Sequence, residues 1–242
     1  MKPADIRKLH QKKHREEAGC FLVEGEHLVQ ELQKAAVQDA RLRTSEIYLT
    51  REYSHWRSQL AMHVVNARHM EQISETRSPQ GIAAVVPLLP APAARPGERA
   101  VYLHEIQDPG NLGTILRTLS WFGSFRCLLS PDSVDPHNGK ALRASMGAIF
   151  HVPVETEVGL ETLPKRFARI ASLDLRGEPI CSPGFRNHDC YVFGNEARGL
   201  PRETLGGIAA TPYTIPGTGV AESLNVAAAL TICQYELHRP RG

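Results

Sequence analysis

The sequence lacks the cysteine spacing that a disulfide framework or a zinc site requires. Its five cysteines are odd in number and widely spread, and they form no C-x-x-C pair and no cysteine–histidine cluster at metal-ligand spacing. Isolated cysteines of this kind are typical of small core residues in a reducing compartment. We therefore expect neither structural disulfides nor a bound metal.

The sequence also lacks a segment that could act as a signal peptide or membrane span. Its N-terminus is charged, and its most apolar stretch, residues 81–94, is interrupted by three prolines. With 42% hydrophobic and 22% charged residues, the 242-residue chain has the composition of a globular protein. These features predict a soluble cytoplasmic protein without a membrane partner.

Phosphate-binding fingerprints are missing as well. The pair Gly217-x-Gly219 does not extend to G-x-G-x-x-G because Glu222 occupies the last position, and no Walker A pattern occurs. Nucleotide hydrolysis and ordinary dinucleotide binding are therefore disfavoured. An oxidoreductase with a nucleotide cofactor stays open as a third interpretation, which an absence of NAD(P) binding would exclude.

Positive charge is concentrated at the N-terminus, although the net charge of +2 does not by itself imply nucleic acid. Residues 1–15 contain six lysines and arginines, among them Lys12, Lys13 and Arg15, against one acidic residue. Such a run offers cations to an RNA backbone. A solvated amphipathic helix would carry the same charges, and charge alone does not separate the two interpretations.

A proline-rich segment, residues 88–98, predicts a semi-rigid linker between two domains. Residues 1–87 read as a small α/β domain with a helix at 6–17, a second helix after Gly25, and strands at 21–24, 47–49, 63–65 and 81–86. Residues 99–242 predict an α/β fold with a mostly parallel, doubly wound sheet. The expected strands are 101–106, 126–129, 170–173, 191–193 and 213–215, and the expected helices are 112–122, 140–149, 160–167 and 224–238.

Three loop-to-helix junctions in the second domain carry polar residues. They contain Asn111 and Arg117, then the run from Gly194 to Gly199, then Ser223 and Asn225. Because α/β proteins bind ligands at the ends of their strands, the three junctions predict one composite site.

Each junction also has a plain structural interpretation. Asn111 and Ser223 would be helix N-caps, Arg117 would pair with Glu105, and Glu196 would pair with Arg198. The N-terminus of the last helix would favour an anionic group.

These junctions resemble the three motifs of the SpoU/TrmH family, which are RNA ribose 2′-O-methyltransferases of the SPOUT superfamily. The resemblance covers about residues 99–240 and rests on Asn111-x5-Arg117, Gly194-Asn195-Glu196-x-x-Gly199-Leu200 and Ile215-Pro216-x-x-Gly219-x3-Ser223-Leu224-Asn225-Val226. Weaker similarity over residues 133–153 includes Arg143. Residues 12–31 and 78–81 resemble the substrate-binding domain of many members. One departure is Gly217, where the family usually has methionine.

The resemblance implies a C-terminal trefoil knot, a homodimer and S-adenosylmethionine as cofactor. Gly194, Asn195, Ile215, Gly219 and Leu224 would bind the cofactor, mainly through their backbone. Lys12, Lys13, Arg15 and Arg143 would contact RNA, with ribosomal RNA favoured over transfer RNA.

The catalytic residues implied by the resemblance are Arg117, Asn111, Glu196, Ser223 and Asn225. Since an arginine stays protonated at neutral pH, our hypothesis gives Arg117 the role of clamping an RNA phosphate and stabilising the forming alkoxide. Asn111 and Asn225 would orient the substrate and the loop, Ser223 would shape the start of the last helix, and Glu196 would orient the arginine or the methyl donor. A non-catalytic RNA-binding or ribosome-assembly factor on the same fold stays open as the alternative.

Overall fold

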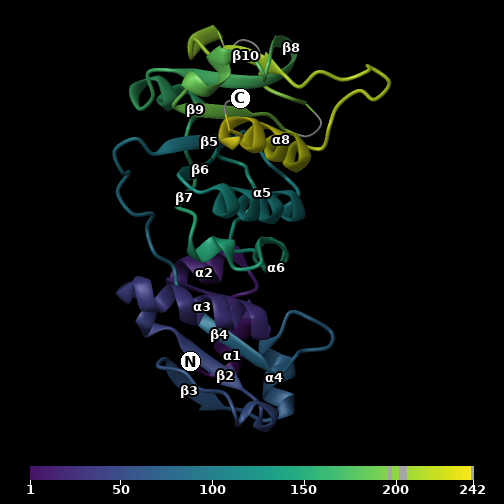
Figure 1. Cartoon of the computed structure of the whole chain (residues 1–242). Coiled ribbons are helices and arrows are strands. Elements are labelled where there is room, and N and C mark those ends of the chain that lie inside the picture. The colour runs from purple at the N-terminus through teal and green to yellow at the C-terminus, as the bar shows by residue number, and fades with distance from the viewer. Residues whose placement is uncertain (196–197, 202–205, 241–242) are drawn as a thin grey trace. The chain divides into compact units, whose positions relative to one another are not determined.

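The computed structural model describes residues 1–195, 198–201 and 206–240 (Figure 1). The chain forms two compact units. Unit 1 contains residues 1–90 and 135–151, and unit 2 contains residues 91–134 and 152–242. The segment 135–151, which follows the second strand of the C-terminal region in sequence, thus belongs to unit 1.

Unit 1 is built on a four-stranded sheet with the order β1-β4-β2-β3. Its strands are β1 (Cys20–Glu24), β2 (Glu46–Leu49), β3 (Ala61–Val64) and β4 (Ile82–Pro87). β4 pairs antiparallel with β1 and β2, while β2 and β3 are parallel. The predicted strand positions are confirmed to within two residues.

Helices cover both faces of this sheet because side chains alternate along each strand. In β1, Phe21 and Val23 join the cluster under α3 (Glu26–Gln38). Cys20 and Leu22 point to the opposite cluster, which is built with residues of α1 (Pro3–Lys8) and α4 (Ala67–Ile73). Unit 1 is therefore a layered α/β structure with a core on each side of its sheet.

The predicted single helix over residues 6–17 is wrong. The chain forms two helices instead, α1 and α2 (Lys12–Ala18), with Gln11 in an extended conformation between them. Ile6 and Leu9 are both buried in the cluster under α4, and this packing ends α1 where amphipathic spacing alone would continue it. α2 ends at Gly19, which adopts the left-handed conformation that glycine tolerates best.

Unit 2 contains a six-stranded sheet with the order β10-β8-β9-β5-β6-β7, in which every pair is parallel. The mostly parallel α/β architecture predicted from the sequence is confirmed. Its elements are β5 (Arg99–Leu103), α5 (Pro109–Phe122), β6 (Phe125–Leu129), β7 (Val154–Glu155), β8 (Ile170–Pro179), β9 (Cys190–Phe193), β10 (Thr211–Thr214) and α8 (Val226–His238). α5 and α8 pack against each other, as Figure 1 also shows.

Two predicted helices differ from the structure. Residues 160–165 form a 3-10 helix that contains Pro164, whose missing N–H and ring clash oppose a regular α-helix. The helix expected over 140–149 is shorter, α6 (Gly139–Ser145), because Met146 and Gly147 both take positive φ before a 3-10 turn at Ala148–Phe150. Strand β7 was not predicted, since two residues are too few to show a pattern.

Candidate functional site

The first junction of unit 2 connects β5 to α5. Asp108 is the N-cap of α5, and its carboxylate accepts a hydrogen bond of 2.9 Å from the Asn111 amide. The prediction that Asn111 is the N-cap is therefore wrong. Asp108 is a good capping residue and Pro109 is favoured at the first helical position, so the helix begins earlier. Asn111 lies in the first turn of α5.

Glu105 joins the first junction to the second, and sequence reasoning missed this role. Its backbone carbonyl accepts 2.8 Å from Asn195 Nδ2, and its carboxylate accepts 2.7 Å from Arg198 Nη2. Glu105 has a positive φ of 49°, an uncommon conformation for a residue with a side chain. An acidic residue just past a buried strand was the only available signal in the sequence.

The second junction follows β9 and is bracketed by Asn195 and Gly199. Asn195 and Gly199 exchange two backbone hydrogen bonds of 3.0 and 2.9 Å, and Asn195 Oδ1 also accepts from the Arg198 amide at 3.0 Å. A Cβ at Gly194 would lie 2.4 Å from the Gly199 carbonyl carbon. Gly194 is thus required by the close approach of the chain's own backbone. Glu196 lies outside the described residues.

The third junction connects β10 to α8 through residues 215–225. Asn225 is the N-cap of α8, and its Oδ1 accepts hydrogen bonds from the amides of Ala227 and Ala228 at 2.9 and 3.2 Å. Ser223 is exposed and does not cap the helix, so that prediction is wrong. Because Asn225 satisfies two of the first amides, the start of α8 is a poorer anion site than the sequence suggested.

Asn225 also joins the third junction to the first. Its Nδ2 donates a hydrogen bond of 2.9 Å to Asn111 Oδ1. Together with the contacts of Glu105, this bond links all three junctions at the carboxyl ends of the parallel strands. Asn111 and Asn225 thus contact each other, while Asn195 is connected to the first junction through Glu105.

The loop before α8 is open to solvent. Leu224 is 51% exposed and Val220 is 91% exposed, whereas Ile215 is half-buried. Gly219 takes a positive φ of 78°, which favours glycine there. Gly217 has no positive φ, and a Cβ at that position would meet no atom within 4 Å. The backbone at Gly217 would therefore accept a residue with a Cβ.

Arg117 is exposed on α5, and within the described part of the chain it makes no hydrogen bond or ion pair. The interpretation as a salt bridge to Glu105 is wrong, because that carboxylate binds Arg198 instead. The apolar stripe of α5 faces the core through Leu112, Ile115, Leu116 and Leu119. This leaves the Arg117 guanidinium available to an anion supplied from outside unit 2.

A titratable group also lies at the first junction. Burial lowers the pKa of His104 below its usual range, although the neighbouring Glu105 carboxylate, 3.6 Å from Nε2, acts in the opposite direction. The lowered pKa favours the neutral form of the imidazole. Sequence reasoning had found no such group among its candidate residues.

The four predicted RNA contacts in unit 1 have different surroundings. Arg15 is buried, and its guanidinium binds Asp135 Oδ2 at 2.5 and 3.1 Å and the Leu9 carbonyl at 2.7 Å. A residue whose donors are consumed inside the fold does not fit a phosphate contact, so the prediction for Arg15 is withdrawn. Arg143 is exposed and pairs with Glu75 at 3.3 Å.

Lys12 and Lys13 are exposed on α2. Each lies 3.8 Å from a glutamate four residues later, Glu16 and Glu17 respectively. These acidic residues stand just beyond the N-terminal run, and they reduce the local charge that the run implied.

Two absences apply to residues 1–195, 198–201 and 206–240. No group of three or more histidine, cysteine, aspartate or glutamate side chains there could hold a metal ion. No helix in this part of the chain is long and apolar enough to cross a bilayer.

Two family descriptions match the chain. The SpoU rRNA Methylase family matches residues 98–235, and the MRM3-like substrate binding domain matches residues 4–84. The first match covers all three junctions, and the second covers the sheet of unit 1 up to β4.

Individual relatives match over nearly the whole chain. The 23S rRNA (guanosine(2553)-2′-O)-methyltransferase RlmP of Bacillus subtilis is 32% identical over 98% of this chain and 95% of its own. The 23S rRNA (uridine(2479)-2′-O)-methyltransferase of Streptomyces viridochromogenes is 30% identical over 94% of this chain and 85% of its own. A crystal structure of an rRNA methyltransferase from Sinorhizobium meliloti with bound AdoMet superposes with a TM-score of 0.81, at 28% identity over 97% of this chain and 93% of that one.

Proposed function

Because the chain belongs to the SpoU rRNA methylase family, we propose that it transfers a methyl group from S-adenosylmethionine to a ribose 2′-hydroxyl of ribosomal RNA. The observation that supports the proposal is that hydrogen bonds connect the first junction to both others: Glu105 bonds to Asn195 and Arg198, and Asn111 bonds to Asn225. An rRNA substrate would be met in the cytoplasm.

The residues of this site fit the cofactor. S-adenosylmethionine donates its methyl group from a sulfonium and carries no phosphate. The start of α8 is compatible with such a ligand, because Asn225 already accepts hydrogen bonds from two of the helix's first amides, which a phosphate would otherwise use. The exposed apolar side chains of Val220 and Leu224 offer contact surface beside the loop. Gly194, Asn195, Ile215, Gly219 and Leu224 would hold the cofactor, mainly through backbone groups. The same occupied amides disfavour a dinucleotide and hence the oxidoreductase interpretation.

S-adenosylmethionine supplies an electrophilic methyl group when it is bound. The chain must then orient a ribose hydroxyl and stabilise the negative charge that develops on its oxygen. Arg117 would do so, since its guanidinium is exposed and no described carboxylate neutralises it. Asn111 and Asn225, held by their mutual hydrogen bond, would keep the start of α5 and the loop before α8 in place.

We include Ser223 and Glu196 in the proposed site on their place in the motifs. Ser223 is exposed one turn before α8 and could reach a substrate, while Glu196 lies outside the described residues. The trefoil knot belongs to the same proposal. Its support is that the chain leaves β10, at the edge of the sheet, and returns to pack α8 against α5.

We also propose that the chain forms a homodimer through α5 and α8. Each helix exposes large apolar side chains: Trp121 is 84% exposed, Tyr235 62% and Ile232 39%. Thr118 and Thr231 join the two helices through their hydroxyls at 3.1 Å, so these side chains belong to one packed pair. Exposed aromatic residues of this kind are enriched at protein interfaces.

The dimer is tested by mass in solution. Trp121→Glu combined with Tyr235→Glu should give a monomer by light scattering, whereas Val37→Glu, at an exposed apolar position of α3 in unit 1, should leave the mass unchanged. A dimer that survives the double variant would move the interface elsewhere.

The activity is tested with the purified chain, labelled S-adenosylmethionine and unmodified ribosomal RNA. We expect one labelled nucleotide, with the label on the ribose, located by mass spectrometry of nuclease fragments. Label on a base would contradict the proposed reaction. RNA binding without cofactor binding, measured by calorimetry, would favour the alternative of a non-catalytic RNA-binding or assembly factor.

A further inference from the structure

Unit 1 contains an open pocket that the three junctions of unit 2 do not involve. Its volume is about 470 Å³, within the range of ~300–1,000 Å³ typical of small-molecule sites. Three chain segments line it: the start of α3, the 3-10 turn after β2 (Arg51–Tyr53) and the loop before β4. The lining residues are Glu26, His27, Gln30, Tyr53 and Gln80.

Two glycines allow these segments to meet. Gly25 and Gly81 take positive φ values of 97° and 89°. A Cβ at Gly25 would lie 2.7 Å from Gln80 Oε1, and one at Gly81 would lie 2.7 Å from Thr50 Oγ1. Positive φ and the close approach of these side chains therefore favour glycine beside Glu26 and Gln80, two residues that line the pocket.

The Glu26 carboxylate is held in a defined orientation. Gln30 Nε2 donates to one oxygen at 3.0 Å and the Tyr53 hydroxyl donates to the other at 3.4 Å, while the Glu26 amide donates to Gln80 Oε1 at 3.1 Å. Burial and the nearby Glu26 charge raise the pKa of Tyr53, so its hydroxyl keeps its proton. Each carboxylate oxygen has a second acceptor position, which leaves Glu26 able to bind two further donors.

Aromatic rings continue from the pocket along the same turn. Tyr53 stacks on His55 with 5.9 Å between ring centroids and 22° between planes, and it meets Trp56 edge-on at 5.9 Å. Trp56 is anchored by a 2.8 Å hydrogen bond to Gln33. Rigid aromatic surfaces of this type stack on unpaired bases in RNA-binding proteins.

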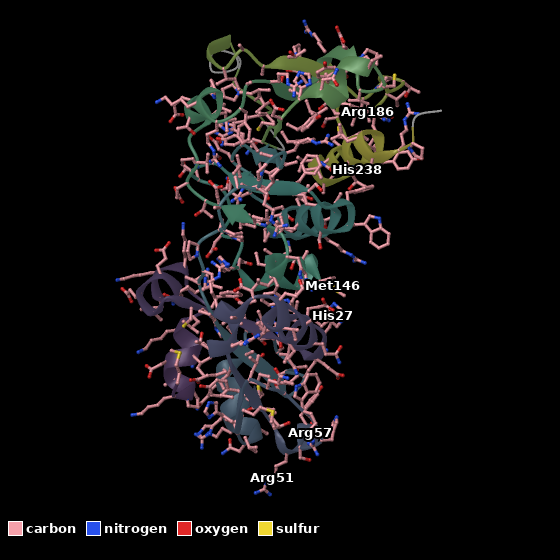
Figure 2. All side chains as sticks on the ribbon, turned by 60° about the vertical axis from the view of Figure 1, so that its left-hand side comes forward. His27, Arg51, Arg57, Met146, Arg186 and His238 are labelled. Atoms are coloured by element: carbon pink, nitrogen blue, oxygen red, sulfur yellow. The ribbon has the colours of Figure 1, made fainter. Side chains whose placement is uncertain are left out.

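Two arginines flank these rings, and no described carboxylate pairs with either. Arg51 is exposed, and Arg57 donates only to the carbonyls of Ser54 and Trp56 among the described residues. Figure 2 shows both side chains at the surface of unit 1. His27, also labelled there, is held by its Nε2 donating 3.2 Å to the Met146 carbonyl. The segment thus combines aromatic rings with unneutralised cations, as single-stranded RNA requires.

We propose that this pocket receives an unpaired guanine of the RNA substrate, at a position separate from the methylated ribose. Guanine carries two adjacent N–H donors on its Watson–Crick edge, which match the two oxygens of Glu26. Uracil places carbonyl oxygens there, and adenine and cytosine offer only an amino group. Tyr53 stacks on the base, and Arg51 and Arg57 bind the flanking phosphates. The inference rests on the proposed function because it takes RNA as the ligand.

Anisotropy with labelled RNA tests this inference on the full chain. The probes are unstructured 12-mers of uridine with one central guanosine, adenosine or cytidine, and the all-uridine 12-mer. We expect the guanosine probe to bind at least fivefold more tightly than the others. Glu26→Gln should reduce this preference below twofold, and Tyr53→Ala should weaken guanosine binding about fivefold or more, within the range measured for stacking.

The cations are tested by salt dependence. Arg51→Gln with Arg57→Gln should lower the slope of log affinity against log salt by about two, one for each arginine. Arg68→Gln is the control for each single arginine replacement, because Arg68 is exposed on α4, whose residues pack under the opposite face of the sheet, and the change removes one charge away from the pocket. Tyr53→Phe keeps the ring and should retain most of the affinity, which guards against a misfolded alanine variant.

Three outcomes would overturn the inference. Equal binding of all four probes by the wild type would show that the chain does not distinguish the bases. An undiminished guanosine preference in Glu26→Gln would show that Glu26 does not recognise the base. Free GMP and the unlabelled guanosine RNA are compared as competitors of the labelled probe. If both displace it at the same concentration, the pocket is a mononucleotide site and not an RNA site. Selective guanosine binding by a chain that never methylates RNA would leave this inference standing while the proposed function fails.

Discussion

Two arginines on helices show how differently the two units use the same charge. Arg15 on α2 is buried and binds Asp135, 120 residues away in sequence, together with the Leu9 carbonyl. Arg117 on α5 is exposed and has no partner among the described residues. Both were predicted from the sequence to meet RNA, but only Arg117 has its donors left for a ligand.

The difference teaches that charge in a sequence does not reveal where the charge is used. The N-terminal cations look available because their partners lie later in the chain: Glu16, Glu17 and Asp135. Arg51 and Arg57 do not belong to a cluster of positive charge in the sequence. They nevertheless lack acidic partners in the described structure. Availability is a property of the fold.

The largest effect is expected when Arg15 is replaced, because this change tests whether Arg15 stabilises unit 1 and does not bind RNA. Arg15→Met leaves the mostly buried Asp135 with His137 as its remaining polar partner and should destabilise unit 1 by up to about 3–5 kcal/mol. Urea unfolding followed by fluorescence of Trp56, in a Trp121→Phe background, reports on unit 1 alone. Lys12→Met, which removes an exposed pair, should cost less than about 1 kcal/mol.

The pH dependence adds a second readout for Arg15. Burial acts to raise the pKa of Asp135, but hydrogen bonds from His137 and Arg15 outweigh it and hold that pKa well below its usual range. The pair's contribution is therefore complete above the unfolded pKa of about 3.9 and is lost as the pH falls further toward the folded pKa. The gap between wild type and Arg15→Met should stay constant from pH 7 to about 5 and narrow below about 4. An Arg15→Met chain of unchanged stability but weakened RNA binding would reverse our assignment.

Arg117→Ala should have the opposite signature. Loss of a group that stabilises developing charge lowers the rate of methyl transfer by about 10²–10³-fold. Thermal unfolding and cofactor affinity should stay at wild-type values, because Arg117 is exposed and makes no hydrogen bond or ion pair among the described residues. Arg176→Ala, at an exposed arginine of β8 in unit 2, should leave the rate unchanged. A near wild-type rate in Arg117→Ala would exclude its catalytic role.

Asn225→Ala tests the same distinction within unit 2, between polar side chains that hold the fold together and those that are exposed to a ligand. The change removes the N-cap of α8 and the bond to Asn111, and should lower stability by about 0.5–2 kcal/mol. Cofactor affinity should fall as well, since two junctions are uncoupled. Ser223→Ala is the control at the position expected from sequence to cap the helix, and its thermal unfolding should match the wild type. Equal losses in both variants would argue against Asn225 as the cap.

The smallest effect is expected for Lys12 and Lys13. Replacing both with glutamine should lower the salt slope of RNA binding by less than one, because each lysine lies close to a glutamate. The double variant at Arg51 and Arg57, measured on the same RNA, should lower it by about two. A larger effect at the lysines would restore the N-terminal run as the main electrostatic contact.

Regular elements with clear periodicity could be predicted, and those that depend on distant contacts could not. Buried strands such as Tyr191–Phe193 and the apolar stripe of α5 are visible in the sequence because burial imposes their pattern. The break between α1 and α2 could not be seen, since it depends on where Leu9 packs. Strand β7 has two residues, and among the described strands it pairs with β6 alone.

The same division holds for the candidate site. Its residue types were predictable, because three polar junctions follow three apolar strands. The roles of particular residues were not: Asp108 caps α5 in place of Asn111, and Asn225 caps α8 in place of Ser223. Gly194 proved to be required by the backbone of Gly199. Each of these details depends on a hydrogen bond or an approach distance between residues, which periodicity does not encode.

By itself the sequence determined the α/β architecture, the parallel sheet and the set of motif residues, because hydrophobic period and turn chemistry are local properties of the chain. The tertiary structure alone decided which charges remain available. It buried Arg15 against Asp135, left Arg117 exposed, and gathered Glu26, Tyr53 and Gln80 around one pocket. Such assignments require contacts between residues tens to more than a hundred positions apart, and only the folded backbone brings those residues within hydrogen-bond distance.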